Sequence, residues 1–238
     1  MNTNNKDVVI NDIEVRVIRK DIKNIHLGVY PPDGKVRIAV PLHINDDSVR
    51  LAVISKLSWI KKKQLDFLNQ PRQSAREFVS GECHYFMGTR YRLDVIERSG
   101  CPMVYIKNAS KLVLETDLNS SRELRASLLD QWYRKELKKV IPALIQKWEP
   151  IVEKSVTEWG IKKMKTKWGT CNSDARRIWL NLELAKKPIE CLEYVIVHEM
   201  VHFFERSHNE NFKAHMDRFF PKWRFYKSLL NALPLDVI

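Results

Sequence analysis

One segment, residues 194–208, constrains this chain more than any other, because it places two histidines and a glutamate inside an apolar run. His198 and His202 are four residues apart, so on an α-helix they lie one turn apart on the same face. Two imidazoles in that geometry can bind a single Zn²⁺ ion, and Glu199 beside them can accept a proton from an attacking water. Since apolar residues surround the motif on nearly all sides, we expect a buried helix whose polar residues are satisfied by a metal.

A catalytic zinc site needs a third protein ligand and one open position. His208 follows His202 by six residues, at a point where the helix could end and the chain turn back. The spacing equals that of the metzincins, but Glu205 replaces their glycine and no later Met-turn follows, so we do not expect that class. We favour His208 as the third ligand, with Glu205 holding a ring N–H of a ligating histidine. The alternatives are Glu205 itself, His215 and Asp217.

The net charge of +12 raises a nucleic-acid hypothesis. The basic residues are dispersed, however, and two of the three lysine-rich runs lie on amphipathic helical patterns that predict solvated faces. The third run lies just before the metal-site candidates and could contact an anionic substrate through Lys162, Lys163, Lys165 and Lys167.

The same composition bears on the compartment. The first residues are polar, no apolar run is long enough to span a membrane, and the four cysteines are widely spaced. These features predict a cytoplasmic protein with free thiols and no membrane segment.

Hydrophobic periodicity predicts an α+β fold. Strand-like alternation at residues 13–17, 25–29 and 36–40 indicates an antiparallel meander, and a helical pattern follows over residues 46–69. A second β section spans residues 81–114, and a long helix is expected over residues 122–156, without any internal repeat. We therefore expect a β-rich region with one helix over residues 10–118 and a metal-binding catalytic region over residues 119–238, together forming one continuous domain.

Two short strands are expected at residues 164–172 and 178–182, directly before the metal helix, which is expected to contain Pro188 in its first turn. The edge of this strand pair could hold an extended peptide by backbone hydrogen bonds while the metal centre attacks one carbonyl. Cys171 is expected to be a small buried packing residue. Lys167 and Asn181 are the candidates for stabilising the oxyanion.

Taken together, these segments resemble the YgjP-like metallopeptidases (domain of unknown function 45), which are related to the SprT and M48 zincins. The matching residues are Lys167-Trp168-Gly169-Thr170-Cys171-Asn172, Leu180-Asn181-Leu182, Val197 to His202, Glu205, His208 and Phe212, with Pro41, Trp59-Ile60, Gly81, Gly88 and Tyr91 in the N-terminal half.

This resemblance covers nearly the whole chain and implies a zincin-like fold that binds Zn²⁺. It implies His198, His202 and His208 as the ligands and Glu199 as the catalytic base. Glu205, Lys167, Trp168 and Asn181 are further candidates beside the metal or the substrate. Arg206-Ser207 stands where many members carry Pro-Asn, which alters the turn into His208.

The leading functional hypothesis is a zinc metallopeptidase that cleaves peptides or proteins. One alternative is a metal-dependent nucleoside triphosphate pyrophosphohydrolase, although the sequence contains no Gly-rich phosphate loop and no carboxylate-rich Mg²⁺ cluster. The other is a DNA-associated SprT-like protease, which the dispersed positive charge supports only weakly. The sequence does not specify the substrate or the oligomeric state.

Overall fold

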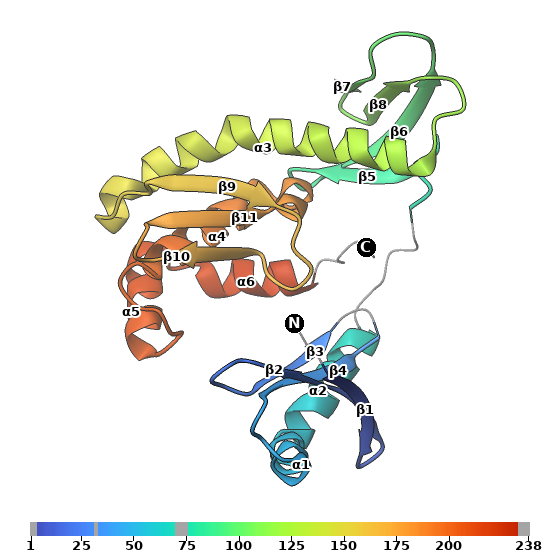
Figure 1. The fold of residues 1–238 in the computed structure, drawn as a ribbon. Helices are drawn as coiled ribbons and strands as arrows, with labels where there is room; N and C mark the ends of the chain where they lie inside the picture. Colours follow the sequence, from blue (N-terminus) through green and yellow to red (C-terminus); the bar gives the residue numbers. More distant parts are fainter. Residues whose placement is uncertain (1–3, 31–32, 70–75, 233–238) are drawn as a thin grey trace. The chain divides into compact units, whose positions relative to one another are not determined.

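The computed structural model describes residues 4–30, 33–69 and 76–232. They fall into two compact units, residues 4–69 and residues 76–232 (Figure 1). Each unit has its own hydrophobic core. The division predicted near residue 119 falls inside the second unit, because strands before that point and the long helix after it contribute to one core.

The first unit contains a four-stranded sheet. Its strands are β1 (Asn4–Ile10), β2 (Ile13–Lys20), β3 (His26–Tyr30) and β4 (Lys35–Pro41), in the order β1-β2-β4-β3. The predicted antiparallel meander is wrong, because β2 pairs with β4 in parallel and β3 lies at the outer edge. Alternating apolar residues determine which side chains face the core, but they do not determine which strand becomes the neighbour.

The single helix predicted over residues 46–69 is divided into α1 (Asp46–Ile54) and α2 (Leu57–Asn69). Asn45 caps α1, because its side chain accepts a hydrogen bond from the backbone N–H of Ser48 at 2.8 Å. Both helices contribute apolar residues to the core under the sheet, namely Val49, Val53 and Ile60.

The first sheet of the second unit has the same topology. Its strands are β5 (Cys83–Phe86), β6 (Thr89–Glu97), β7 (Met103–Asn108) and β8 (Lys111–Thr116), in the order β5-β6-β8-β7, with β6 and β8 parallel. In both sheets the first hairpin turns through two residues with positive φ, Asn11 and Asp12 in one and Met87 and Gly88 in the other. Positive φ at both positions is what a type I′ hairpin turn requires. The repeated topology has no counterpart in the sequence.

Helix α3 (Arg122–Val152) follows this sheet and ends at Val152 rather than at the predicted residue 156, because Glu153 adopts the left-handed conformation. The chain then forms β9 (Glu158–Lys162), a strand that the sequence analysis missed. A three-stranded sheet follows, with the order β10 (Gly169–Asn172), β11 (Arg177–Asn181) and β9. Within the described part of the chain, β10 has a strand partner on one side only.

The remaining elements are the 3-10 helix η1 (Leu182–Lys186) and the helices α4 (Ile189–Val201), α5 (Glu210–Phe219) and α6 (Trp223–Ala232). Helix α4 lies at the centre of the second unit and contacts α3, α5 and α6 as well as β10 and β11 (Figure 1). Among the described residues, no helix is both long enough and apolar enough to cross a membrane.

Candidate active-site cleft

Helix α4 carries His198 and Glu199 in its last turn, and His202 is its C-terminal cap. Pro188 is the N-cap of this helix rather than part of its first turn as predicted. The apolar residues around the motif are buried, as expected, because α4 is packed on several sides by the other elements of the unit. A helix held in this way positions its polar side chains with little freedom.

Three imidazoles converge at the end of α4. One ring nitrogen of each of His198, His202 and His208 lies within 4.8 Å of the others. The Nε2 atoms of His198 and His208 are 3.0 Å apart, whereas two nitrogens bound to one tetrahedral Zn²⁺ at ordinary bond lengths would be separated by about 3.3 Å. The structure therefore brings the three predicted ligand residues together in a geometry that suits a single ion.

Phe212, near the start of α5, packs against all three imidazoles. Its ring centroid lies 4.9 Å from that of His198 and 4.7 Å from those of His202 and His208. Asn209 caps α5 by accepting a hydrogen bond from the backbone N–H of Phe212 at 3.0 Å. The cap fixes the position of the phenylalanine, and the phenylalanine in turn limits the orientations of the histidine rings.

The turn between α4 and α5 brings His208 back to the helix. The Glu205 carboxylate accepts hydrogen bonds from the backbone N–H and the hydroxyl of Ser207, at 3.3 and 3.1 Å. A side-chain hydrogen bond with Asn209, followed by these bonds with Ser207, lowers the pKa of Glu205. Glu205 therefore holds the turn rather than adding a fourth group to the histidine cluster.

The sequence predicted that the Glu205 side chain holds a ring N–H of a ligating histidine. In the structure, the backbone carbonyl of Glu205 has this role instead. His202 Nδ1 lies 2.9 Å from the backbone carbonyl oxygen of Glu205. Because a carbonyl only accepts, this contact places the proton on Nδ1 and leaves the Nε2 lone pair of His202 for a metal. His198 Nδ1 has a longer contact, 3.5 Å, with the Tyr194 hydroxyl.

All three imidazoles are held in the neutral form. Burial, together with the charges of the neighbouring histidines and Lys227, lowers the pKa of His198 to about 3. Burial also lowers the pKa values of His202 and His208. Neutral imidazole is the form that binds a metal, so the cluster does not need to lose a proton at neutral pH.

Glu199 is buried, and its burial raises its pKa to about 8, although Lys167 and a hydrogen bond with Cys171 act in the opposite direction. Its neighbour across the cleft is Gly169 of β10. A Cβ atom at Gly169 would lie 2.5 Å from Glu199 Oε1 and 2.9 Å from Cγ and Cδ. Any side chain at this position would force the carboxylate to move from where it lies.

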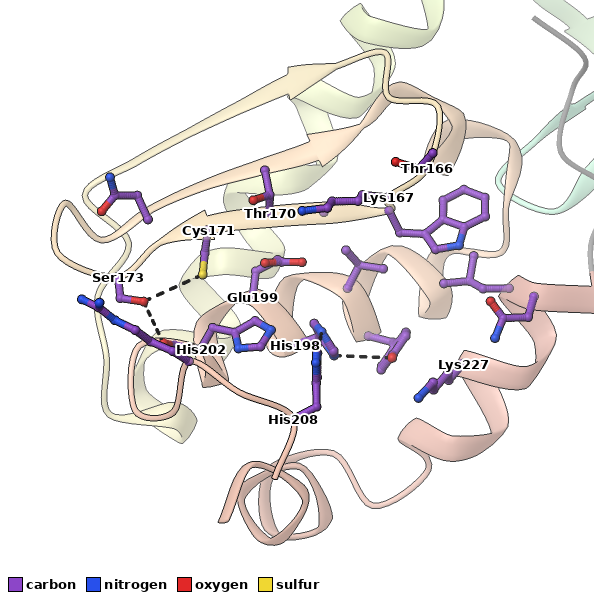
Figure 2. A pocket seen from close by; sticks show the side chains of 18 of the residues that line it. Thr166, Lys167, Thr170, Cys171, Ser173, His198, Glu199, His202, His208 and Lys227 are labelled. Carbon is purple, nitrogen blue, oxygen red and sulfur yellow. Dashed lines mark hydrogen bonds between the residues drawn. The ribbon is translucent and has the colours of Figure 1, made fainter. Parts of the chain in front are cut away.

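These residues line a cleft of about 720 Å³. One wall is the segment from Thr166 to Asp174, which includes the edge strand β10, and the opposite side is formed by α4, His208 and α6 (Figure 2). Ser173 ties the two sides together, because its hydroxyl donates to the backbone carbonyl of His202 at 2.9 Å. Cys171 packs against the core as expected, but it is only half-buried and also lines this cleft, and burial keeps its pKa above the ordinary value.

Asn181, an oxyanion candidate from sequence, does not line the cleft. It is buried, and its amide nitrogen donates to the carbonyls of Met164 and Lys167 at 2.8 and 2.7 Å. Its side-chain oxygen accepts from the backbone N–H of Glu183 at 3.2 Å. Asn181 therefore anchors the loop that leads into β10, a role that the spacing of the motif did not reveal.

The lysine-rich run is divided among different environments. The Lys162 ammonium nitrogen lies 3.7 Å from the centroid of the Trp179 ring, in a cation–π contact. Lys163 forms an ion pair with Asp130, with 2.8 Å between Nζ and Oδ2. Of the four lysines, Lys167 alone lines the cleft, together with the predicted Trp168. This arrangement removes the clustered phosphate site on which the nucleotide hypothesis depended.

The alternative third ligands lie elsewhere. The His215 ring stacks on the Phe204 ring, with 4.8 Å between the ring centroids. Asp217 accepts hydrogen bonds from Trp223 and Arg224. The residues of the cleft that the sequence analysis missed include Tyr194, Lys227 and Asn231. Tyr194 could have been found by helical spacing, since it precedes His198 by one turn, but Lys227 lies on a distant helix.

No curated protein matches the chain. Among solved structures, the chain is similar to the metallopeptidase zymogen of Pyrococcus abyssi abylysin, with 15% identity, a TM-score of 0.36 and coverage of 41% of this chain and 99% of that chain. It is also similar to the metallopeptidase zymogen of Methanocaldococcus jannaschii jannalysin, with 22% identity, a TM-score of 0.33 and coverage of 38% and 92%.

A family model gives the wider match. The YgjP-like metallopeptidase domain matches residues 23–233, which include the histidine cluster, Glu199 and β10. The resemblance inferred from sequence is thereby confirmed over most of the chain. A metal cofactor and a peptide or protein substrate follow from that family. The chain belongs to the YgjP-like metallopeptidase domain family.

Proposed function

We propose that this chain is a zinc-dependent peptidase in which His198, His202 and His208 hold the ion and Glu199 is the general base. The observation that carries the proposal is the convergence of three neutral imidazoles beside a buried carboxylate in one cleft. Three histidines, with no fourth protein ligand among the residues that the structure describes, match the donor set of catalytic zinc sites rather than that of structural ones. The zincin-like character of the fold is part of the same proposal.

The donor set fits zinc on chemical grounds. Imidazole nitrogens suit Zn²⁺, whereas Mg²⁺ and Ca²⁺ prefer oxygen ligands, and the cluster contains no carboxylate. When bound, the ion would supply a Lewis acid for the peptide carbonyl and for the attacking water.

Glu199 supplies the proton chemistry. Its carboxylate is held between α4 and β10, and the closeness of Gly169 fixes where it points. In its ionised form, a carboxylate with a raised pKa is a stronger base than an exposed glutamate. Glu199 would take the proton of the attacking water and then deliver it to the leaving amine.

The edge of β10 supplies the binding surface for the peptide. This strand precedes α4 in the chain and lines the cleft, and β11 occupies only one of its sides. An extended peptide could add to the free side through backbone hydrogen bonds, which bind substrates with little dependence on side chains. The scissile carbonyl would then lie between Gly169 and the histidine cluster.

Metal content and cleavage test the proposal together. Wild-type protein and Glu199→Gln should each bind about one zinc per chain, and His208→Ala should bind much less. His215→Ala is the matched control, because His215 lies on α5 but outside the cluster. Cleavage of a peptide library should be lost in Glu199→Gln with zinc retained. Zinc loss in Glu199→Gln, or unchanged zinc in His208→Ala, would contradict the assigned roles.

A further inference from the structure

The charged residues of the cleft are not balanced. Its lining contains three cations, Lys167, Arg206 and Lys227, and two acids, Asp174 and Glu199. Arg206 donates to Asp174 at 2.6 Å. The charge of Lys167 acts on Glu199 and lowers its pKa. Within the part of the chain that the structure describes, Lys227 forms no ion pair; Lys167 forms none either, but its charge acts on Glu199.

Lys227 lies close to the histidines. It projects from α6, which packs against α4, and Figure 2 shows its side chain extending from α6 towards His198 and His208. Its positive charge contributes to the low pKa values of both imidazoles. Its ammonium nitrogen is 5.6 Å from the centroid of Trp223, a cation–π contact that leaves its hydrogen-bond donors available.

This position opposes the binding of a dication. A metal dication bound by His198 and His208 would repel the Lys227 ammonium, and this repulsion is stronger in a cleft than in bulk water. An anionic group of the substrate, bound between Lys227 and the ion, would reverse the sign of the interaction. The placement of Lys227 is therefore favourable in the substrate complex and unfavourable without it.

Asn231 completes the arrangement. It follows Lys227 by four residues on α6, so the two side chains are neighbours on one face of the helix, and both line the cleft. An ammonium and an amide N–H₂ together offer several donors to the two oxygens of a carboxylate. Hydrogen bonds that involve a charged donor and a charged acceptor are the stronger ones.

We propose that Lys227 and Asn231 form a carboxylate-binding subsite, so that the cleft selects peptides with an acidic side chain or a free C-terminal carboxylate beside the scissile bond. This proposal rests on the proposed peptidase function and names its substrate class. A carboxylate is favoured over a phosphate chain because Arg206 is paired with Asp174 and the charge of Lys167 acts on Glu199, which leaves the Lys227 ammonium as the cation without such an interaction.

Cleavage of matched peptides tests the selectivity. One series carries glutamate, glutamine or lysine at each position around the scissile bond, and a second ends in a free or an amidated C-terminus. Wild-type protein should favour the carboxylate-bearing peptide by roughly tenfold in kcat/KM. Lys227→Met should abolish this preference, and Lys227→Glu should favour lysine instead. Lys222→Met is the matched control, because Lys222 is an exposed lysine that does not line the cleft.

Binding provides a readout that does not depend on turnover. In a Glu199→Gln background, calorimetry with an acidic peptide should show weaker binding for Lys227→Met and Asn231→Ala, with a weaker salt dependence for the former. Zinc affinity should change in the opposite direction, rising severalfold in Lys227→Met because a repulsive charge is removed. A merely structural role for Lys227 would lower both affinities.

The two proposals can fail separately. Peptide cleavage without any preference for a carboxylate would overturn the subsite and leave the peptidase function intact. Absence of cleavage, with Lys227-dependent binding of acidic peptides, would overturn the peptidase function and leave the subsite intact. Tighter Lys227-dependent binding of ATP than of acidic peptides would overturn the choice of a carboxylate. A preference that the free C-terminus alone produces would identify the main-chain carboxylate as the group bound.

Discussion

Replacing Gly169 by alanine would place a methyl group where the carboxylate of Glu199, the proposed general base, now lies. The added Cβ would be 2.5 Å from Glu199 Oε1 and 2.9 Å from its Cγ and Cδ, which are distances that real Cβ contacts essentially never show. The β10 backbone is held by its pairing with β11, and Glu199 is held on the buried helix α4. The carboxylate is the part that can move, so we expect it to shift by roughly 1 Å.

A displacement of that size acts on the chemical step. A misplacement of about 1 Å in a catalytic group can lower the rate roughly 100-fold. We therefore expect Gly169→Ala to lower kcat by about this factor, with KM and zinc content little changed, since the three atoms nearest to the added Cβ all belong to Glu199. Overpacking should also lower the free energy of unfolding by about 1–3 kcal/mol. Steady-state kinetics, metal analysis and denaturant titration on the same preparation measure these effects.

Gly160→Ala is the matched control. In the same sheet, a Cβ at Gly160 would lie 2.1 Å from the Trp179 ring, so this variant is at least as overpacked but does not touch Glu199. It should lose stability while keeping kcat per folded molecule. The reasoning would be refuted if Gly169→Ala kept its kcat, or if Gly160→Ala lost kcat to the same extent.

Three further predictions concern the surroundings of the site. Phe212→Ala should cost about 3–5 kcal/mol of stability and weaken zinc binding, whereas Phe212→Leu should cost less; unchanged zinc affinity in the alanine variant would contradict the supporting role of the ring. Asn181→Ala should cost about 1–3 kcal/mol and raise KM, because two loop carbonyls lose their donor, and an unchanged KM would argue against the anchoring role. The unfolded chain protonates His198 near its ordinary pKa of about 6.5, but the folded metal-free protein does so only at about 3. The unfolded state therefore binds more protons in this window, and the free energy of unfolding should fall as the pH decreases from about 6.5 towards 3. Denaturation of metal-free His198→Gln should show a shallower pH dependence, and an equal slope would refute the assignment.

Part of the site was predictable because local spacing determines it. A helix places His198 and His202 on one face whatever surrounds it, and the apolar flanks require that this helix be buried. The joint presence of the Trp-Gly-x-Cys segment and the histidine motif led to the correct family. The α+β character followed from the alternation of strand and helix periods.

The predictions that the structure contradicts concern which strands pair with each other and where helices end. The parallel pairing of β2 with β4 depends on which chain segments meet, and side-chain alternation does not record it. The break between α1 and α2 lies within a continuous helical pattern. The sequence pattern predicted a helix as far as residue 156, which left no strand predicted at the position of β9. In the structure, Glu153 ends that helix in the left-handed conformation.

The sequence by itself determined the helix, its two histidines and the neighbouring glutamate, because these relations are set within a single turn of backbone. Only the tertiary structure decided the rest of the cleft. The fold of the α4–α5 turn brings His208 to His198, the packing of β10 on α4 requires glycine at position 169, and the packing of α6 on α4 places Lys227 beside the histidines. Contacts of this kind join residues whose separation along the chain has no fixed period, so they arise only when the core is packed.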